Sequence, residues 1–199
     1  MFRIFRDITD FVKKPNYEKI AIIDIETTDL KPENGLIIEI GIVELNLITG
    51  ATKILFDSLV KELPFGDIHR NAWIFNNSDL KFEDFEEAPS LSHVKNQIQE
   101  ICDRYSMTAY NNAFDFGFME SRGFVIKKDI PDIMAVAKEA CKIMYPRGGY
   151  KNPKMQEAWD NLFPNTNYIE KHRAVDDAIH EAKILFEMYK RGDYKIEPY

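Results

Sequence analysis

Residues 20–26 read Ile20-Ala-Ile-Ile-Asp24-Ile-Glu26, an apolar run that ends in two acids separated by one isoleucine. If the run is a β-strand, alternate side chains share a face, so Asp24 and Glu26 point the same way. An edge strand could expose both acids to water. Isoleucines on both faces instead favour a central strand, where two adjacent carboxylates need a neutralising partner. Divalent cations that prefer oxygen ligands, Mg²⁺ or Mn²⁺, provide one.

The length and composition indicate one globular domain with an ample core. The chain has 199 residues and 45% hydrophobic content, enough for a single domain spanning 1–199, with a core at about 19–191. A net charge of −7 argues against a protein that coats nucleic acid, but not against an enzyme that holds a strand end locally and binds metals through acidic residues. Cys102 and Cys141 lack metal-site spacing and are expected to be reduced thiols of a cytoplasmic protein.

The first residues carry interleaved charges and resemble neither a secretory signal nor a membrane anchor, so no membrane association is expected. Phe2, Phe5, Ile8 and Phe11 recur at helical spacing and predict a short amphipathic helix within an N-terminal extension, residues 1–15. This helix is expected to pack on the domain. A membrane-surface or partner-binding helix is the alternative.

Periodicity and turn residues predict strands followed by alternating strands and helices. Strands are expected at 19–26, 36–46 and 51–60 as an antiparallel meander, and at 107–110 and 124–126. Helices are expected from Ser90, over 114–122, 131–145 and 153–163, and from Arg173 to Arg191, the last one closed by Gly192. The pattern predicts a mixed α/β sheet flanked by helices.

Two further segments carry isolated acids. Asp115 follows the predicted strand 107–110 at the start of a helix, where ligands of α/β sheets gather, although an acid in a first helical turn is also ordinary. His172 precedes the last helix and Asp177 lies in its first turns, close to the apolar stripe that includes Val175 and Ala178. An acid beside an apolar stripe is rarely left unpaired.

Three acidic segments follow one another along the chain: Asp24-Ile-Glu26-Thr-Thr, Tyr110-Asn-Asn-Ala-Phe-Asp115 and His172-Arg-Ala-Val-Asp-Asp177-Ala. Together they resemble the three motifs of the DEDDh (DnaQ-like) 3′→5′ exonuclease family, over about residues 19–190. The resemblance implies a ribonuclease H-like fold. It also implies that Asp24, Glu26, Asp115 and Asp177 bind two Mg²⁺ or Mn²⁺ ions and that His172 is the general base. Two such ions can clamp an in-line phosphoryl displacement, and a histidine can accept the proton of the attacking water near neutral pH.

The chain departs from the family pattern at several positions. Tyr110 replaces the usual His and Asn112 the usual Ala of the second motif, which affects substrate contacts rather than metal ligands. Asp29 stands where Gly is common after the two threonines, so the turn geometry there is open. In the third motif the five-residue spacing from His172 favours Asp177 over Asp176.

Substrate-binding residues are expected next to these motifs. By family likeness, Thr27 and Thr28 contact the terminal nucleotide and Asn111 orders the site. In the aromatic-rich stretch 63–89, Trp73 and Phe75 are the expected base-stacking residues, although each could instead fill the core. The basic segment Lys142–Lys154 could contact phosphates or be a solvated loop.

The expected function is metal-dependent 3′→5′ hydrolysis of single-stranded ends, releasing nucleoside 5′-monophosphates, with DNA slightly preferred because no residue visibly recognises a 2′-hydroxyl. RNA trimming of the RNase T or oligoribonuclease type is the alternative. A third hypothesis is a subunit that docks on a polymerase or clamp through residues 156–163, which loosely resemble a clamp-binding box.

Overall fold

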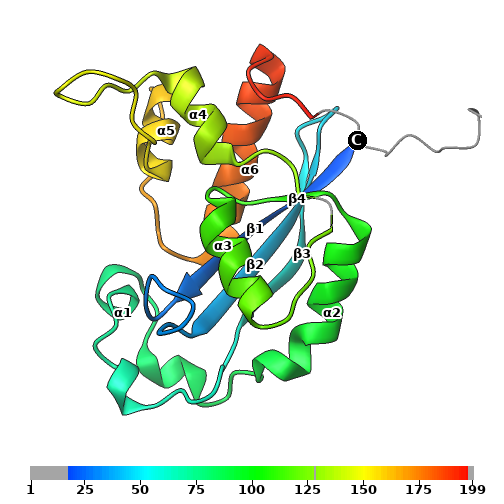
Figure 1. Ribbon diagram of the computed structural model, residues 1–199, viewed down its shortest axis with the longest axis vertical. Coiled ribbons are helices and arrows are strands. Elements are labelled where there is room, and N and C mark those ends of the chain that lie inside the picture. The colour runs from blue at the N-terminus through cyan, green and yellow to red at the C-terminus, as the bar shows by residue number, and fades with distance from the viewer. Residues whose placement is uncertain (1–17, 128, 197–199) are drawn as a thin grey trace, which may run out of the picture.

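The computed structural model describes residues 18–127 and 129–196, and its centre is a four-stranded sheet in the order β3-β2-β1-β4 (Figure 1). The strands are β1 (Lys19–Thr27), β2 (Ile37–Asn46), β3 (Thr52–Leu59) and β4 (Met107–Thr108). The first three pair antiparallel, and β4 runs parallel to β1. The predicted meander and mixed sheet are therefore confirmed.

Helices cover both faces of this sheet (Figure 1). The two largest core clusters join one face to α4 (Ile133–Cys141), α5 (Met155–Leu162) and α6 (Ala174–Arg191), and the other to α2 (Leu91–Arg104) and α3 (Asn112–Ser121). The long connection after β3 holds a third cluster and contains the short helices η2 (Asp67–His69), α1 (Ile74–Asn77) and η3 (Phe82–Phe85).

The apolar run 20–26 occupies the sheet interior because its isoleucines serve both faces. Ile20 and Ile22 pack in the cluster with α6, whereas Ile23 and Ile25 pack in the cluster with α2 and α3. The alternation of a strand then directs Asp24 and Glu26 to the α6 side, beyond Ile22. The first strand thus carries both acids toward the longest helix.

Three predicted elements differ in the structure. The strand predicted at 124–126 is wrong, because both the N–H and the carbonyl of Val125 bond to the side-chain amide of Gln99 on α2, at 2.9 Å each. The helix predicted to reach Tyr145 ends at Cys141, where Lys142 adopts a left-handed conformation with φ 52°. The strand predicted over 107–110 is limited to two residues.

The other helices match their predicted bounds within two residues, and α6 ends at Gly192 with φ 82° as expected. The predicted N-terminal helix lies outside the described residues. Among the helices of 18–127 and 129–196, none has the length and apolar character needed to cross a bilayer.

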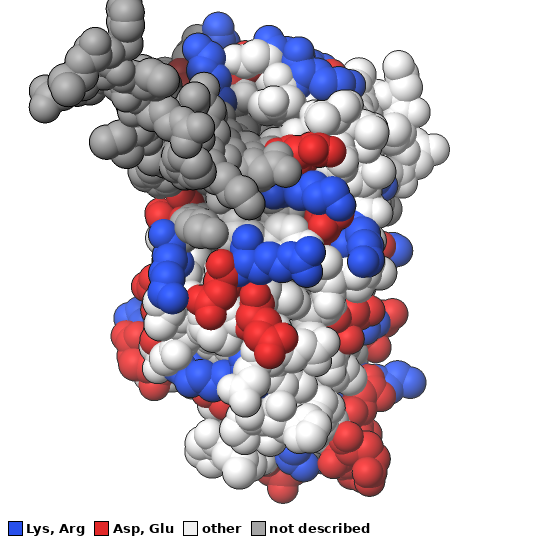
Figure 2. Space-filling view, turned by 90° about the vertical axis from the view of Figure 1, so that its right-hand side faces the viewer, with Lys and Arg blue, Asp and Glu red and all other residues white. Residues whose placement is uncertain are grey.

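Charged side chains of both signs are interspersed on the face of the molecule seen in Figure 2. On that face the described Lys and Arg side chains lie among Asp and Glu side chains and form no continuous basic surface.

Candidate active site

Asp24 and Glu26 are the first two acids of the site, and both are half-buried at the end of β1. Burial raises the pKa of Asp24 well above its usual range, and four neighbouring carboxylates raise it further. In decreasing order of effect these are Glu181, Asp115, Glu26 and Asp177. Burial likewise raises the pKa of Glu26, followed by the charge of Asp177. The end of β1 is therefore a place where negative charge accumulates.

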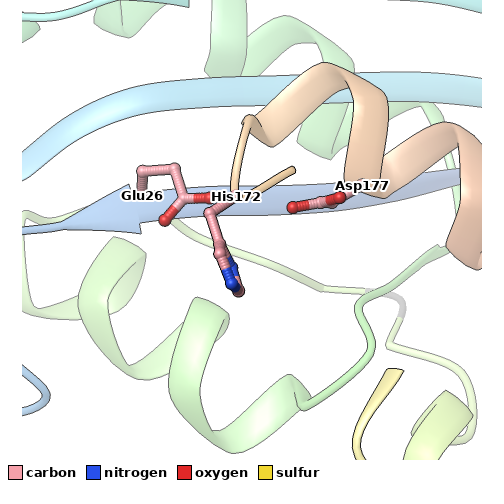
Figure 3. A group of neighbouring side chains, drawn as sticks. All are labelled: Glu26, His172 and Asp177. Atoms are coloured by element: carbon pink, nitrogen blue, oxygen red, sulfur yellow. The ribbon is translucent and has the colours of Figure 1, made fainter. Parts of the chain in front are cut away.

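The start of α6 brings a third acid and a histidine to this place. Figure 3 shows Glu26 extending from β1, with His172 just before α6 and Asp177 in its first turn. Their possible ligand atoms all lie within 4.8 Å of one another. His172 has a left-handed backbone with φ 54°, which a non-glycine residue rarely adopts. The backbone turns at this residue immediately before the helix.

Close contact between helix and sheet at Gly41 makes this arrangement sterically accessible. Gly41 is paired with Asp24 across β1 and β2, and its Cα faces the backbone of Ala174 and Val175. A Cβ at this position would lie only 2.4 Å from those backbone atoms. The absence of a side chain therefore allows α6 to begin directly against the strand pair that carries Asp24.

Asp115 is the fourth acid and comes from the first turn of α3. It is buried, and its Oδ1 accepts a 3.3 Å hydrogen bond from the backbone N–H of Ile25, between the two acids of β1. Burial raises the pKa of Asp115 to about 8. This bond ties α3 to β1 at the site.

The two adjacent acids of α6 have different surroundings. Asp177 is buried and accepts hydrogen bonds from the Tyr168 hydroxyl at 2.8 Å and the Arg173 N–H at 3.2 Å. Asp176 is less buried and pairs with Lys171 at 2.8 Å. Burial opposes ionisation of Asp176, but the Lys171 hydrogen bond and other contacts leave its pKa below the usual value. Only Asp177 of this pair belongs to the group with Glu26 and His172.

Three residues that sequence reasoning missed support the segment before α6. Arg173 donates to the buried Glu39 on β2, from Nη2 at 2.8 Å and Nε at 3.0 Å, and from Nη1 to Asp79 in the long connection at 2.8 Å. Glu170 places Oε1 3.8 Å from His172 Nδ1, and burial raises its pKa to about 7. Tyr168 was missed because a hydroxyl donor leaves no spacing pattern in the sequence.

Glu181 is a fifth carboxylate near Asp24, on α6 one turn after Asp177. It is only 2% exposed, and burial followed by the charges of Asp115 and Asp177 raises its pKa well above the usual range. The signal that singled out Asp177, an acid within an apolar helical stripe, was also present at Glu181, between Ala178 and Ala182.

A hollow of about 360 Å³ adjoins the site, and four of its lining residues are Glu26, Thr27, Thr28 and Trp73. Trp73 is 59% exposed, and its ring lies edge-on to His172 with 4.9 Å between centroids. Phe75 is not in the lining and packs against Phe82 and Phe85 in the cluster of the long connection. Its surroundings are those of a core residue.

Of the two asparagines in the second motif, the family likeness favoured Asn111, which precedes α3 as its N-cap. The side chain with extensive bonding is instead that of Asn112. Its Oδ1 accepts from the Ala109 N–H at 2.7 Å, and its Nδ2 donates to the Ile130 carbonyl at 2.9 Å. Tyr110 donates its hydroxyl to the Pro153 carbonyl at 2.9 Å. Both departures from the family pattern therefore hold loops together.

The chain resembles known exonucleases over most of its length. Residues 21–185 match the family model described as Exonuclease (RNase_T). The chain is 28% identical over 180 residues to a PolC-type DNA polymerase III of Clostridium perfringens, covering 87% of this chain and 11% of that protein. It is 26% identical over 178 residues to the DNA polymerase III epsilon subunit of Escherichia coli, covering 84% of this chain and 68% of the subunit.

Among solved structures, the nuclease domain of 3′hExo, a DEDDh family member bound to rAMP, superposes with a TM-score of 0.67 at 20% identity. The match covers 94% of this chain and 100% of that domain, and it confirms the ribonuclease H-like fold. With the family model spanning 21–185 and the three acidic segments gathered at the end of β1, this chain belongs to the DEDDh family of 3′→5′ exonucleases.

Proposed function

We propose that this chain is a metal-dependent 3′→5′ exonuclease that shortens single-stranded ends and prefers DNA. The observation that carries the proposal is the meeting of Glu26, His172 and Asp177 within 4.8 Å, with Asp24 beside Glu26 on β1 and Asp115 bonded to the strand between them. This set combines anionic oxygen ligands with one proton acceptor, as phosphodiester hydrolysis requires.

The acids fit a pair of hard divalent cations. Burial raises the pKa of Asp24, Glu26, Asp115 and Asp177, and several also repel one another, so a bound cation would relieve a cost that the fold carries without it. Carboxylate oxygens are the ligands that Mg²⁺ and Mn²⁺ prefer, and these four residues would hold them. Bound cations supply charge stabilisation at the phosphate and a more acidic water.

His172 would act as the general base. A water attacks the terminal phosphodiester in line, the bond to the 3′ oxygen of the preceding nucleotide breaks, and a nucleoside 5′-monophosphate leaves. The attacking water loses a proton, which the imidazole of a histidine can accept. The side chain lies at the rim of the site beside Trp73, where it can reach an incoming strand end.

The terminal nucleotide would occupy the hollow beside Glu26. Thr27 lies at its edge, and the exposed Trp73 ring offers a stacking surface for a base. The Thr28 hydroxyl accepts the Leu36 N–H at 2.9 Å, and the Thr28 N–H donates to the Leu36 carbonyl at 3.0 Å, so Thr28 would offer the hydrogen of its hydroxyl to the nucleotide. DNA is favoured because the sequence relatives reported above belong to DNA polymerases; RNA trimming is the second candidate, favoured by the neighbour bound to rAMP.

Association with a polymerase is a further candidate that the same relatives favour. It would not use the clamp-box-like segment 156–163, because its two anchor side chains, Trp159 and Leu162, are buried in the core cluster with α4 and α6. A polymerase partner would therefore contact some other surface of the chain.

The test is digestion of 5′-labelled single-stranded DNA and RNA of equal sequence with Mg²⁺ or Mn²⁺. We expect a ladder that shortens from the 3′ end, faster on DNA, and its loss in His172→Ala and Asp177→Asn. Asp176→Asn is the matched control and should retain activity, since Asp176 bonds to Lys171 outside the ligand group. Intact DNA and RNA in the presence of bound metal would contradict the proposal.

A further inference from the structure

Glu181 occupies a position that packing alone does not explain. It projects from the buried face of α6, one turn beyond Asp177, where its helical neighbours Ala178 and Ala182 are small and fully buried. The charge of Glu181 is also the strongest neighbouring influence on the pKa of Asp24. Glu181 therefore faces the acids of the site from behind the first turn of α6.

The bonding of Glu181 is incomplete. Its Oε2 is fully buried and has no hydrogen-bond partner among residues 18–127 and 129–196. Buried polar atoms are nearly always satisfied, so an orphaned carboxylate oxygen indicates a missing group. The neighbouring charges that act on Glu181, those of Asp115, Asp177 and Glu170, are all negative, so a cation is the group that would satisfy Oε2.

Glu39 shows how this same fold satisfies a buried glutamate that has no metal to bind. Glu39 is 1% exposed, and both its oxygens accept hydrogen bonds from the guanidinium of Arg173. Its Oε2 also accepts the Ala174 N–H. Glu181 is 2% exposed, and its Oε2 has no such partner in the part of the chain that the structure describes. Glu39 is thus neutralised by a residue of the chain, whereas the Oε2 of Glu181 is available to bind a cation.

We propose that Glu181 is a fifth carboxylate of the cation site, binding through Oε2 the divalent ion that Asp24 and Asp115 hold. The inference rests on the function proposed above and goes beyond the four acids of the three motifs. An additional anionic oxygen strengthens the hold on a hard cation, and Mn²⁺ is the suitable probe because its free form is measured directly by electron paramagnetic resonance.

The experiment titrates the metal-free protein with Mn²⁺ and measures free ion by this resonance. Glu181→Gln keeps the size of the side chain and one carbonyl oxygen but removes the charge. We expect its Mn²⁺ Kd to rise about tenfold, the lower end of losses seen when groups around a metal are removed. Glu187→Gln is the matched control, since Glu187 lies on α6 and pairs with Lys190 and Arg191 at the surface. It should bind Mn²⁺ like the wild type.

Thermal unfolding gives a second readout. Without metal, Glu181→Gln should melt at the wild-type temperature or above it, because a buried acid has been removed; with Mn²⁺ its gain in Tm should be smaller. If Glu181→Gln does not fold, Glu181→Asp keeps the charge, withdraws it by one methylene and should still weaken Mn²⁺ binding.

Equal Mn²⁺ affinity of wild type and the Glu181 variant, with binding lost in Asp24→Asn, would overturn this inference and leave the proposed function intact. Equal weak binding by the wild type and Asp24→Asn would overturn both, because the site would then not bind metal at all.

Discussion

Replacement of Gly41 by alanine should damage the active site without touching an active-site side chain. A Cβ on Gly41 would lie 2.4 Å from the Ala174 carbonyl carbon and the Val175 nitrogen, about 1 Å inside the 3.4 Å at which ordinary contact begins. These are backbone atoms at the start of α6 and cannot rotate away. The helix start must therefore shift from the sheet by about 1 Å, and His172 and Asp177 shift with it.

Two magnitudes follow from that displacement. Overpacking of this kind costs roughly 1–3 kcal/mol of unfolding free energy, which urea denaturation measures. A misplacement of about 1 Å in a reacting constellation costs about 100-fold in rate, which kcat on labelled single-stranded DNA measures. We expect the loss in kcat to exceed what the unfolded fraction explains, because folded molecules carry the shifted helix.

Gly117→Ala is the matched control. Gly117 lies within α3, and a Cβ there would meet nothing within 4 Å, so alanine should leave kcat unchanged and stabilise the protein by up to about 1 kcal/mol. A Gly41→Ala protein with wild-type kcat and wild-type urea midpoint would refute the reasoning, since α6 would then not depend on the bare backbone of β2.

Four further predictions concern single groups. Trp73→Ala should raise KM for single-stranded DNA about tenfold, within the roughly 1–3 kcal/mol of one base stack, and an unchanged KM would argue that the ring does not meet the substrate. Phe75→Ala should lower the unfolding free energy by about 2 kcal/mol, less than the loss of a fully buried phenylalanine, and change KM little. A raised KM with unchanged unfolding free energy would instead show that Phe75 contacts the substrate. Tyr168→Phe removes the 2.8 Å hydrogen bond to Asp177 and should weaken Mn²⁺ binding about tenfold by calorimetry, whereas wild-type affinity would exclude an orienting role. The metal-free protein should lose stability in urea as pH rises from about 5 to 8, because folded Asp115 keeps its proton up to about pH 8 and the unfolded chain releases it near 4; saturating Mn²⁺ should abolish this trend, and a flat metal-free profile would count against it.

The elements that sequence periodicity predicted well are those whose burial is dictated locally. The isoleucines of 20–26 occupy both faces of a central strand, and α6 runs from its predicted start to Gly192 because its apolar stripe and its left-handed terminus are both local signals. The five-residue spacing from His172 to Asp177 is likewise a local signal, because His172 lies just before α6 and Asp177 in its first turn. It predicted that Asp177, rather than Asp176, lies beside Glu26.

The elements that were mispredicted depend on distant partners. Residues 124–126 have strand-like composition, but the side-chain amide of Gln99 on α2 bonds to both the N–H and the carbonyl of Val125. These two groups are therefore not available to pair with a neighbouring strand. Phe75 has the chemistry of a stacking residue, yet two phenylalanines seven and ten residues later enclose it. Glu181 was overlooked because the motif comparison ends at Asp177.

The Arg173 bridge has a consequence for how the protein folds. Its bond to Glu39 joins residues 134 positions apart, and its bond to Asp79 joins residues 94 positions apart. Contacts of such separation close long loops, and closing a loop costs conformational entropy before the contact forms. We expect this corner to consolidate last on folding and to open first in mild denaturant, while the strand pair β1–β2 persists. The amide proton of Ala174, donated to Glu39, would report that opening by its exchange with solvent, so catalytic competence and global stability need not be lost together.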